Sequence, residues 1–184
     1  MSYFENMKIE EQGFTFLQAI ITIALLGLLL TLGMPSFQEL LRNHHLITET
    51  NTLVAALSTA RSEAINRRVR VTICKSNNQS SCTPTAQWED GWIIFSDIDK
   101  DGTYDGAPEN LIVVSAGLSE DNTLRAYSNF VDYISYRPNG ESHGNPNNDG
   151  TFNLCDDRGA AAGRAIQIIS TGRIRIRQGA DTCP

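Results

Sequence analysis

Apolar side chains fill one long segment near the start of the chain. Phe14 to Met34 contain no charged residue, and these 21 positions are about the length that a helix needs to cross a membrane. Beyond Pro35, apolar residues recur at helical spacing, at Leu46, Leu53, Ala56, Leu57, Ala60 and Ala64. We therefore expect a transmembrane helix over 14–34 and an amphipathic helix over 35–68, with Pro35 kinking or loosening the helix between them.

The pattern changes after about residue 69. Short runs of β-branched and aromatic residues alternate with clusters of Gly, Asn, Asp, Ser and Pro. We expect strands at VRVTIC, GWIIFSD, NLIVVSAG, NTLRAY, YISYRP, GTFNLC, RAIQIIS and GRIRIRQ, and a polar loop at HGNPNNDG. One long helix followed by short strands predicts an α+β fold, in which the helix packs on an antiparallel sheet within a β-rich domain over 69–184.

Charge is distributed unevenly along the chain. The 184 residues carry a net charge of -6, which argues against a general nucleic-acid coat. Residues 1–157 carry a net charge of -10. Residues 158–184 carry +4, because they contain five arginines and a single acidic residue, Asp181. The basic character is therefore concentrated at the end of the chain, where any anionic partner would bind.

The four cysteines predict disulfides rather than a metal site. Cys74, Cys82, Cys155 and Cys183 form no CxxC pair, and the three histidines are not spaced with them. In an oxidising compartment two disulfides are expected, with three possible pairings. Proximity in the sequence favours Cys74–Cys82 and Cys155–Cys183. We expect no metal and no cofactor.

The segment QGFTFLQAIITIALLGLLLTLGMPSF resembles the N-terminus of type IV pilins and pseudopilins. Gly13, Phe14, Thr15 and the Pro-Ser-Phe beginning at Pro35 match the family pattern. The resemblance implies a leader over 1–13, cleavage by prepilin peptidase between Gly13 and Phe14, and methylation of the new amino terminus at Phe14. It also implies insertion in the bacterial inner membrane with a periplasmic C-terminal domain, and assembly with other major and minor pilins by the pilus machinery.

Two features depart from that family pattern. The leader MSYFENMKIEEQG is acidic rather than basic, and a start at Met7 would give a shorter, more usual leader. Gln18 stands where the family has a glutamate that pairs with a neighbouring subunit's terminal amine. A buried ion pair that lacks one partner is costly. Gln18 therefore suggests a low-abundance subunit, such as one at the tip, and argues against the major pilin.

The order of the domain's motifs resembles the GspH/FimT family of minor pilins and pseudopilins over nearly the whole chain. The markers are ARSEAI at the helix end and GWIIFSDIDKDG in the first hairpin. FimT proteins of natural transformation carry a C-terminal Gly-Arg-x-Arg motif that contacts DNA. Gly172, Arg173 and Arg175 match this motif, and Arg177 extends it.

The arginines of this motif form a row if the segment is a strand. Arg173, Arg175 and Arg177 then share one face, and their side chains repeat about every 6.6 Å. DNA phosphates repeat about every 3.4 Å along each strand, so the row could bind phosphates without reading bases. Arg158 and Arg164 are further candidates for this patch. Alternatively, the arginines protect an exposed edge strand from aggregation.

Several other motifs receive structural interpretations. Asp97, Asp99 and Asp101, followed by Gly102, match the first half of a calcium loop, but the closing glutamate falls at Glu109, one position late. An Asp/Gly-rich hairpin turn is the simpler interpretation, and the sequence leaves calcium open.

We read the basic residues of RSEAINRRVR as complements to the helix dipole and, less strongly, as a second DNA contact. His44 and His45 are expected to face solvent, and Trp88 and Trp92 to pack in the core or at its rim.

No catalytic constellation has supporting context, so we expect no enzyme. The sequence predicts a minor type IV pilin that binds extracellular double-stranded DNA non-specifically during natural transformation. The alternatives are a structural minor pilin that primes assembly at the pilus tip, and a pseudopilin of type II secretion, neither of which binds DNA.

Overall fold

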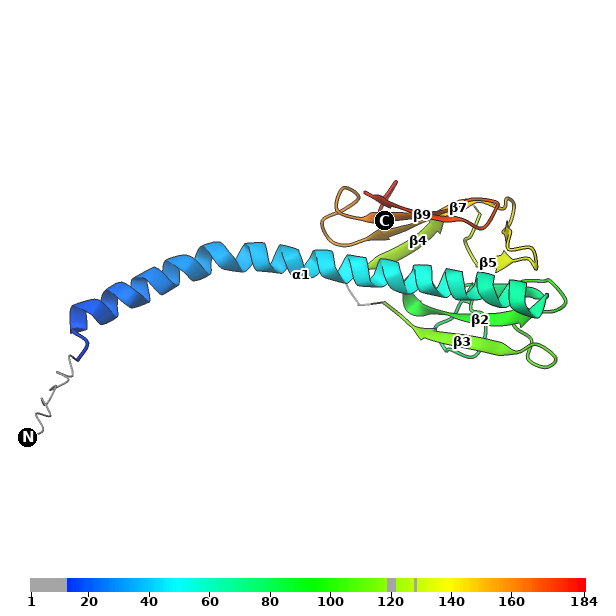
Figure 1. Cartoon of the computed structure of the whole chain (residues 1–184), viewed down its shortest axis with the longest axis horizontal. Coiled ribbons are helices and arrows are strands. Elements are labelled where there is room, and N and C mark those ends of the chain that lie inside the picture. Colours follow the sequence, from blue (N-terminus) through cyan, green and yellow to red (C-terminus); the bar gives the residue numbers. More distant parts are fainter. Residues whose placement is uncertain (1–12, 119–121, 128) are drawn as a thin grey trace, which may run out of the picture. The chain divides into compact units, whose positions relative to one another are not determined.

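A computed structural model describes residues 13–118, 122–127 and 129–184, with the backbone alone at Leu32 and Gly33 (Figure 1). The chain divides into two compact units, and the boundary falls between Leu41 and Arg42. Helix α1, Phe16–Arg67, supplies the first unit and continues into the second without a break at Pro35.

The N-terminal unit is an apolar stretch of α1. The described side chains between Gly13 and Leu41 are exposed. Among the residues that the structure describes, α1 is the one helix long and apolar enough to cross a membrane, by its length and composition. Residues 1–12 of the expected leader lie outside the described residues.

The C-terminal part of α1 provides one side of the domain core. All six apolar positions predicted from helical spacing are buried, namely Leu46, Leu53, Ala56, Leu57, Ala60 and Ala64. They contact apolar residues of both sheets in one continuous core. The helix ends at Arg67 because Arg68 adopts a left-handed backbone conformation with a φ of 58°, which turns the chain into the first strand.

Nine strands follow within the described residues. They are β1 Arg70–Lys75, β2 Gly91–Asp97, β3 Leu111–Ala116, β4 Thr123–Tyr127, β5 Tyr133–Tyr136, β6 Ser142–His143, β7 Gly150–Cys155, β8 Arg164–Ile168 and β9 Ile174–Gln178. A short 3-10 helix, Trp88–Asp90, precedes β2. Each of the eight predicted strand segments contains a strand, and β6 was not predicted.

The strands form two antiparallel sheets, where the sequence led us to expect one. The first sheet has the order β3-β2-β1-β5-β6, and the second has the order β4-β7-β8-β9. The chain passes from the first sheet to the second after β3, returns for β5 and β6, and then completes the second sheet. A strand's own pattern of apolar residues does not reveal which distant strand it pairs with, so the division into two sheets was not predictable. The α+β class with one long helix on antiparallel strands is confirmed.

Aromatic rings and two disulfides consolidate this domain. Trp88 packs edge-on against Phe152 with ring centroids 5.0 Å apart, and its indole N–H donates to the carbonyl oxygen of Phe130 over 2.9 Å. Trp92 is also fully buried. The cysteines pair as Cys74–Cys82 and Cys155–Cys183, as their proximity in the sequence suggested.

Candidate nucleic-acid interface

The arginine-rich segment is the last strand of the second sheet and its edge. Strand β9 pairs only with β8 among the described strands, with Arg175 opposite Gln167 and Arg177 opposite Ala165. Cross-strand partners point to the same face, so these arginines lie on the face of Gln167, away from the core. On the other face, Ile174 packs against the core, while Ile176 is 50% exposed at the open edge.

The three arginines differ in their surroundings. All three side chains are exposed. Arg177 donates to Asp181 over 2.7 Å and is partly neutralised by this ion pair. The side chains of Arg173 and Arg175 make no hydrogen bond or ion pair with any described residue. These two guanidinium groups therefore remain available for an anionic partner, and the three side chains together define the arginine row.

A tight turn places the first arginine of the row. The N–H of Gly172 donates to the carbonyl oxygen of Ile169 over 2.7 Å, and the N–H of Ile169 donates to that of Arg173 over 3.1 Å. Gly172 has a φ of 77°. This arrangement is a three-residue hairpin loop that ends on a left-handed glycine. The glycine of the Gly-Arg-x-Arg motif is thus required by the backbone of the hairpin.

A second contact also restricts Gly172. A Cβ on Gly172 would lie 2.1 Å from the carbonyl oxygen of Gly140, which belongs to the turn between β5 and β6. Arg61 of α1 donates from Nε to that same oxygen over 2.9 Å and from a terminal nitrogen to the carbonyl oxygen of Thr171 over 3.0 Å. One helical arginine therefore ties both turns to α1 and fixes the start of β9.

The first sheet also holds this turn. The N–H of Ser142 donates to the carbonyl oxygen of Ser170 over 3.1 Å. The hydroxyl of Ser142 donates to the carbonyl oxygen of Ile169 over 2.9 Å. The arginine row is therefore carried on a hairpin anchored to α1 and to β6. Of these anchors, only Arg61 lies in the basic segment RSEAINRRVR, which was expected to complement the helix dipole and to offer a second DNA contact.

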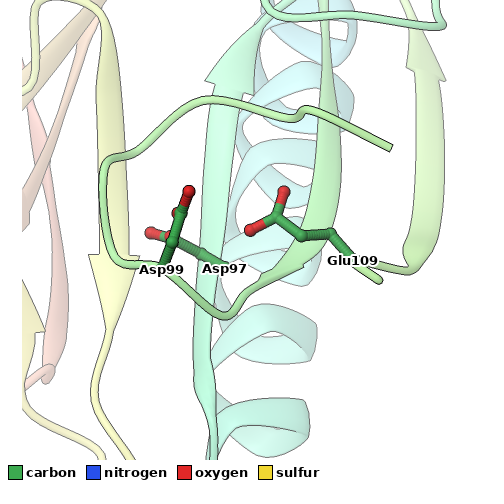
Figure 2. A group of neighbouring side chains, drawn as sticks. All are labelled: Asp97, Asp99 and Glu109. Atoms are coloured by element: carbon green, nitrogen blue, oxygen red, sulfur yellow. The ribbon is translucent and has the colours of Figure 1, made fainter. Parts of the chain in front are cut away.

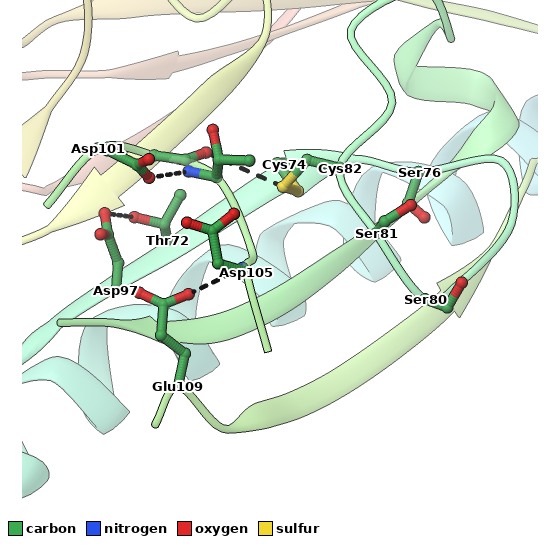
Figure 3. Close-up of a disulfide and its surroundings, with 12 residues drawn as sticks. Thr72, Cys74, Ser76, Ser80, Ser81, Cys82, Asp97, Asp101, Asp105 and Glu109 are labelled. Carbon is green, nitrogen blue, oxygen red and sulfur yellow. Dashed lines mark hydrogen bonds between the residues drawn. A yellow bond between two sulfur atoms is a disulfide. The ribbon is translucent and has the colours of Figure 1, made fainter. Parts of the chain in front are cut away.

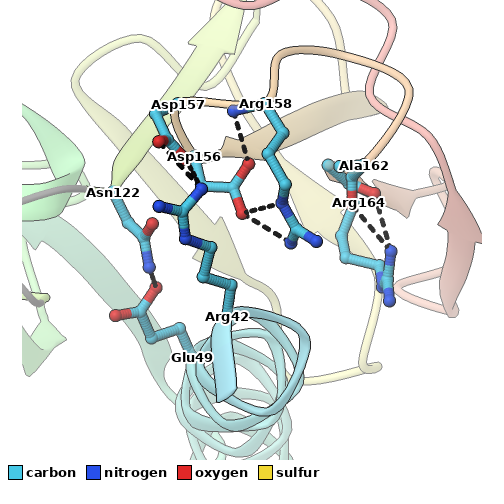
Figure 4. Close-up of polar contacts among 9 residues, drawn as sticks. Arg42, Glu49, Asn122, Asp156, Asp157, Arg158, Ala162 and Arg164 are labelled. Carbon is cyan, nitrogen blue, oxygen red and sulfur yellow. Dashed lines mark hydrogen bonds and ion pairs between the residues drawn. The ribbon is translucent and has the colours of Figure 1, made fainter. Parts of the chain in front are cut away.

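Arg158 and Arg164 do not join the arginine row. Arg158 donates twice to Oδ2 of Asp156, over 2.9 and 2.6 Å (Figure 4). Arg164 lies opposite Leu154, on the opposite face of β8 from Gln167, and donates to the carbonyl oxygens of Ala162 and Gly163. Their hydrogen bonds organise the β7–β8 loop, so the prediction that they extend the patch finds no support in their placement.

Ion pairs hold that loop close to α1. Arg42 pairs with Asp157 at 2.9 Å, next to the pair between Arg158 and Asp156 (Figure 4). Burial alone would raise the pKa of Asp156, but hydrogen bonds from the side chain and backbone of Arg158 outweigh it and hold the pKa below its usual value. These groups neutralise one another and leave little charge for an outside partner.

Acidic groups limit how far the basic surface extends. Asp149 and Asp181 line a hollow of about 560 Å³ together with residues of β7 and β8. The final residues reach this region because Asp181 donates from its backbone to the side chain of Asn153 over 3.0 Å and Cys183 is bonded to Cys155. The exposed positive charge of this sheet is therefore confined to the β9 edge.

Other candidate residues lie elsewhere on the domain. His44 and His45 are exposed, as expected. At the end of α1, Arg67 forms an ion pair with Glu63. A pocket of about 490 Å³ nearby is bordered by four cationic side chains, those of Arg68, Arg70, Lys100 and Arg137. This pocket is the second basic surface, and it includes two of the four helix-end arginines that the sequence suggested as a further contact.

The start of α1 contains a reciprocal cap. The backbone N–H of Thr15 donates to Oε1 of Gln18 over 2.9 Å, and the N–H of Gln18 is 3.3 Å from the hydroxyl of Thr15. This is the capping box of a Thr-x-x-Gln sequence, which satisfies two N–H groups that the helix leaves unpaired. Gln18 thus helps to cap the start of α1 although it carries no charge. Gly13 and Phe14 lie just before it and are exposed.

Two crystal structures of the type IV minor pilin FimU from Pseudomonas aeruginosa resemble this chain. The first has a TM-score of 0.60 at 21% identity and covers 78% of this chain and 98% of FimU. The second has a TM-score of 0.58 at 22% identity and covers 76% of this chain and 100% of FimU. Identities this low establish the fold alone. The long helix and antiparallel sheets are therefore those of a type IV pilin-like protein.

The family follows from a match of the sequence itself. The family described as type II transport protein GspH matches residues 49–172, and the chain belongs to this family. The family and the fold support a minor pilin-like or pseudopilin-like role. The matched residues end at Gly172, directly before the arginine row. No curated protein matches the chain.

Proposed function

We propose that this chain is a minor type IV pilin that binds extracellular double-stranded DNA non-specifically through Arg173, Arg175 and Arg177 during DNA uptake. The observation that carries the proposal is the pair of exposed guanidinium groups of Arg173 and Arg175, which no described residue neutralises. Arg173 directly precedes the edge strand β9 and Arg175 lies within it, on a hairpin that Arg61 anchors. A guanidinium group binds two phosphate oxygens at once, so arginine suits this contact better than lysine.

The geometry of the row suits the phosphate backbone and not the bases. Arginines on one face of a strand repeat about every 6.6 Å, and every second phosphate of a DNA strand repeats at about 6.8 Å. Phosphate contacts position a protein without reading sequence. A single short strand with no protruding helix does not reach into a groove, so we expect binding that is weak, dependent on salt and indifferent to sequence.

The N-terminal segment supplies the setting for this role. We propose that the chain is cleaved between Gly13 and Phe14, methylated at Phe14, and held in the bacterial inner membrane by residues 14–34 with the domain in the periplasm. Assembly into a pilus with other pilins would then carry the domain outside the cell. Because Gln18 offers no carboxylate to a neighbouring amine, we place the subunit at low abundance and favour a position at the tip.

A cellular experiment separates a role in DNA binding from a role in pilus assembly. The chromosomal copy is replaced by Arg173→Gln plus Arg175→Gln, and piliation and transformation frequency are measured in the same strains. We expect normal piliation and a large loss of transformation. As a control for charge, Arg67→Gln plus Arg68→Gln removes two arginines from exposed positions at the end of α1. Because Arg68 borders the second basic surface, the same variant tests that surface separately. Transformation at the wild-type frequency in the row variant would contradict the proposal.

A purely structural role is the second candidate, favoured by membership of the type II transport protein GspH family and by the likeness to FimU. In this case the domain primes pilus assembly or serves type II secretion, and the arginines only keep the β9 edge soluble. This candidate predicts that deletion of the whole chain abolishes pili or secretion, whereas the row variant behaves like the wild type.

A further inference from the structure

The connection between β2 and β3 brings three carboxylates together. Asp97 ends β2, Asp99 follows two residues later, and Glu109 lies two residues before β3. One carboxylate oxygen from each of the three lies within 4.8 Å of the others (Figure 2). Two oxygens on opposite sides of a Ca²⁺ ion are separated by about 4.6 to 5.2 Å, because each ligand lies 2.3 to 2.6 Å from the metal. The cluster therefore has the dimensions of a Ca²⁺ coordination shell.

One oxygen of this cluster is buried without a partner. The side chain of Asp97 is 0% exposed. Its Oδ2 accepts a hydrogen bond of 2.6 Å from the hydroxyl of Thr72, whereas its Oδ1 has no hydrogen-bond partner among the described residues. A buried carboxylate oxygen without a partner is costly, and buried charges are normally paired or coordinate metals. The unpartnered Oδ1 points to a ligand that the protein chain itself does not supply.

A second carboxylate is buried beside it. Glu109 is only 6% exposed, and its Oε1 accepts from the backbone N–H of Ile98 over 2.9 Å. None of the described ion pairs joins Asp97, Asp99 or Glu109 to a lysine or arginine. Arg70 lies near Asp97, but its guanidinium donates to the carbonyl oxygen of Lys100 over 3.1 Å. The buried negative charge is therefore left without a cationic side chain in direct contact.

We propose that Asp97, Asp99 and Glu109 form a Ca²⁺ site that closes the β2–β3 connection. Asp99 also belongs to a second, exposed group with Asp101 and Asp105, in which one carboxylate oxygen from each residue lies within 4.8 Å of the others. This group lies beside the proposed site and adds negative charge to it. All donors are oxygens, which suits a hard cation, and Ca²⁺ accepts six to eight of them in irregular geometry where Mg²⁺ demands an octahedron.

The loop also accounts for the displaced glutamate of the sequence motif. Asp97, Asp99 and Asp101 have the spacing of the first ligands of a calcium loop, and Gly102 has a φ of 84° where such loops turn sharply. The chain then turns back, and the N–H of Glu109 donates to the carbonyl oxygen of Gly106 over 2.8 Å. This turn directs the Glu109 side chain toward Asp97 although it stands one position late (Figure 2).

Neighbouring groups fix the loop before any ion binds. Tyr104 packs against Phe95 with ring centroids 5.4 Å apart, and the Cys74–Cys82 disulfide lies beside the loop (Figure 3). Burial raises the pKa of both Asp97 and Glu109. At Asp97 a hydrogen bond from Thr72, the charge of Arg70 and the backbone of Lys100 oppose this rise. A divalent cation would favour the charged form of each carboxylate and remove the cost of burying them together.

The proposal is tested by thermal unfolding of the full chain in detergent micelles at constant ionic strength. The protein is first treated with EDTA, and CaCl₂ or MgCl₂ is then added up to 10 mM. Extracellular calcium sites have dissociation constants of about 0.1 to 1 mM, so we expect 10 mM Ca²⁺ to raise the melting temperature by about 3 to 10 °C. Mg²⁺ should give at most a small part of that rise.

Variants test whether the Ca²⁺-dependent rise in melting temperature comes from the carboxylates of Asp97, Asp99 and Glu109. Asp99→Asn changes an exposed side chain, so the variant should fold, and it should lose most of the Ca²⁺-dependent rise. Glu109→Gln should also lose most of the rise. Its amide oxygen can still accept from the N–H of Ile98, but it gives up the acceptor that Oε2 offers to the N–H of Asp105. Asp149→Asn removes an exposed carboxylate elsewhere and should respond as the wild type does. No rise in the wild type, an equal rise with Mg²⁺, or an undiminished rise in Asp99→Asn would each overturn the proposal.

Discussion

The α-carbon of Gly172 faces the carbonyl oxygen of Gly140 so closely that a Cβ would lie 2.1 Å from it. Two turns from different sheets therefore meet at a point where the backbone of Gly140 leaves no room for a side chain at position 172. Arg61 donates to the Gly140 oxygen in the same place. The hairpin that presents the arginine row depends on this contact, and it connects the stability of the domain to the position of the row.

Gly172→Ala should destabilise the domain and weaken DNA binding together. The methyl group meets a backbone oxygen, and φ is positive, which costs about 1 to 2 kcal/mol for a residue with a Cβ before any clash is counted. We expect a total loss of more than about 2 kcal/mol in chemical denaturation. Gly106→Ala is a control, because Gly106 has a φ of 83° but nothing within 4 Å of its added Cβ. Equal losses in the two variants would show that the Gly140 contact contributes nothing.

Arg61→Lys should destabilise the domain although it keeps the charge. Arg61 is partly buried and donates in two directions, to the carbonyl oxygens of Gly140 and Thr171. An ammonium group lacks the guanidinium fork, and a hydrogen bond to a charged donor contributes about 1.5 to 3 kcal/mol. Denaturation should show a loss of this order, whereas Arg67→Lys at an exposed position should change stability by less than about 0.5 kcal/mol. A stability of Arg61→Lys equal to that of the wild type would refute the anchoring role.

The pair of Arg158 with Asp156 should make stability depend on pH. The pKa of Asp156 is lower in the folded state than its ordinary value, so its contribution is present above pH 4 to 5 and is lost as the pH falls through the folded-state pKa. Asp156→Asn should therefore cost about 1 to 2 kcal/mol at pH 7 and much less near pH 2. Asp157→Asn, in an exposed pair, should cost less than about 1 kcal/mol at either pH. A cost for Asp156→Asn that stays constant with pH would contradict this prediction.

The two disulfides should differ in their effect on stability. Cys155–Cys183 has a sequence separation of 28 and Cys74–Cys82 of 8. By chain entropy, removing the longer link should cost about 3 to 4 kcal/mol and the shorter about 2 to 3 kcal/mol. Serine variants of each pair, compared by denaturation, test this order. The Cys155–Cys183 variant should still bind DNA, because β9 remains paired with β8; loss of binding would place the tail itself in the interface.

Local patterns in the sequence predicted most of the fold, because helices and strands leave periodic signals. The buried stripe from Leu46 to Ala64 and all eight expected strands are found in the structure. Strand β6, Ser142–His143, has only two residues, too few to show alternation. The separation into two sheets depends on pairings between distant strands, such as β1 with β5, which no local pattern encodes.

The site was less predictable than the fold. Alternation placed Arg175 and Arg177 on one face correctly, because a strand fixes that relation. It did not show that Arg158 binds Asp156, or that Arg164 lies on the opposite face of β8. The role of Gly172 depends on Gly140, 32 positions earlier in the chain, and the return of Glu109 toward Asp97 depends on a turn. Such contacts arise only when the loops fold against each other.

Salt-dependent DNA binding by the full chain tests the central claim most directly. The dissociation constant for a double-stranded fragment of arbitrary sequence is measured in detergent micelles over a range of NaCl concentrations. For about three phosphate contacts, log affinity should fall against log salt with a slope near -2.7, and Arg173→Gln plus Arg175→Gln should bring it to about -0.9 with much weaker binding. The control Arg67→Gln plus Arg68→Gln should keep the wild-type slope. Equal affinity and slope in the wild type and the row variant would contradict the claim that the arginine row binds DNA.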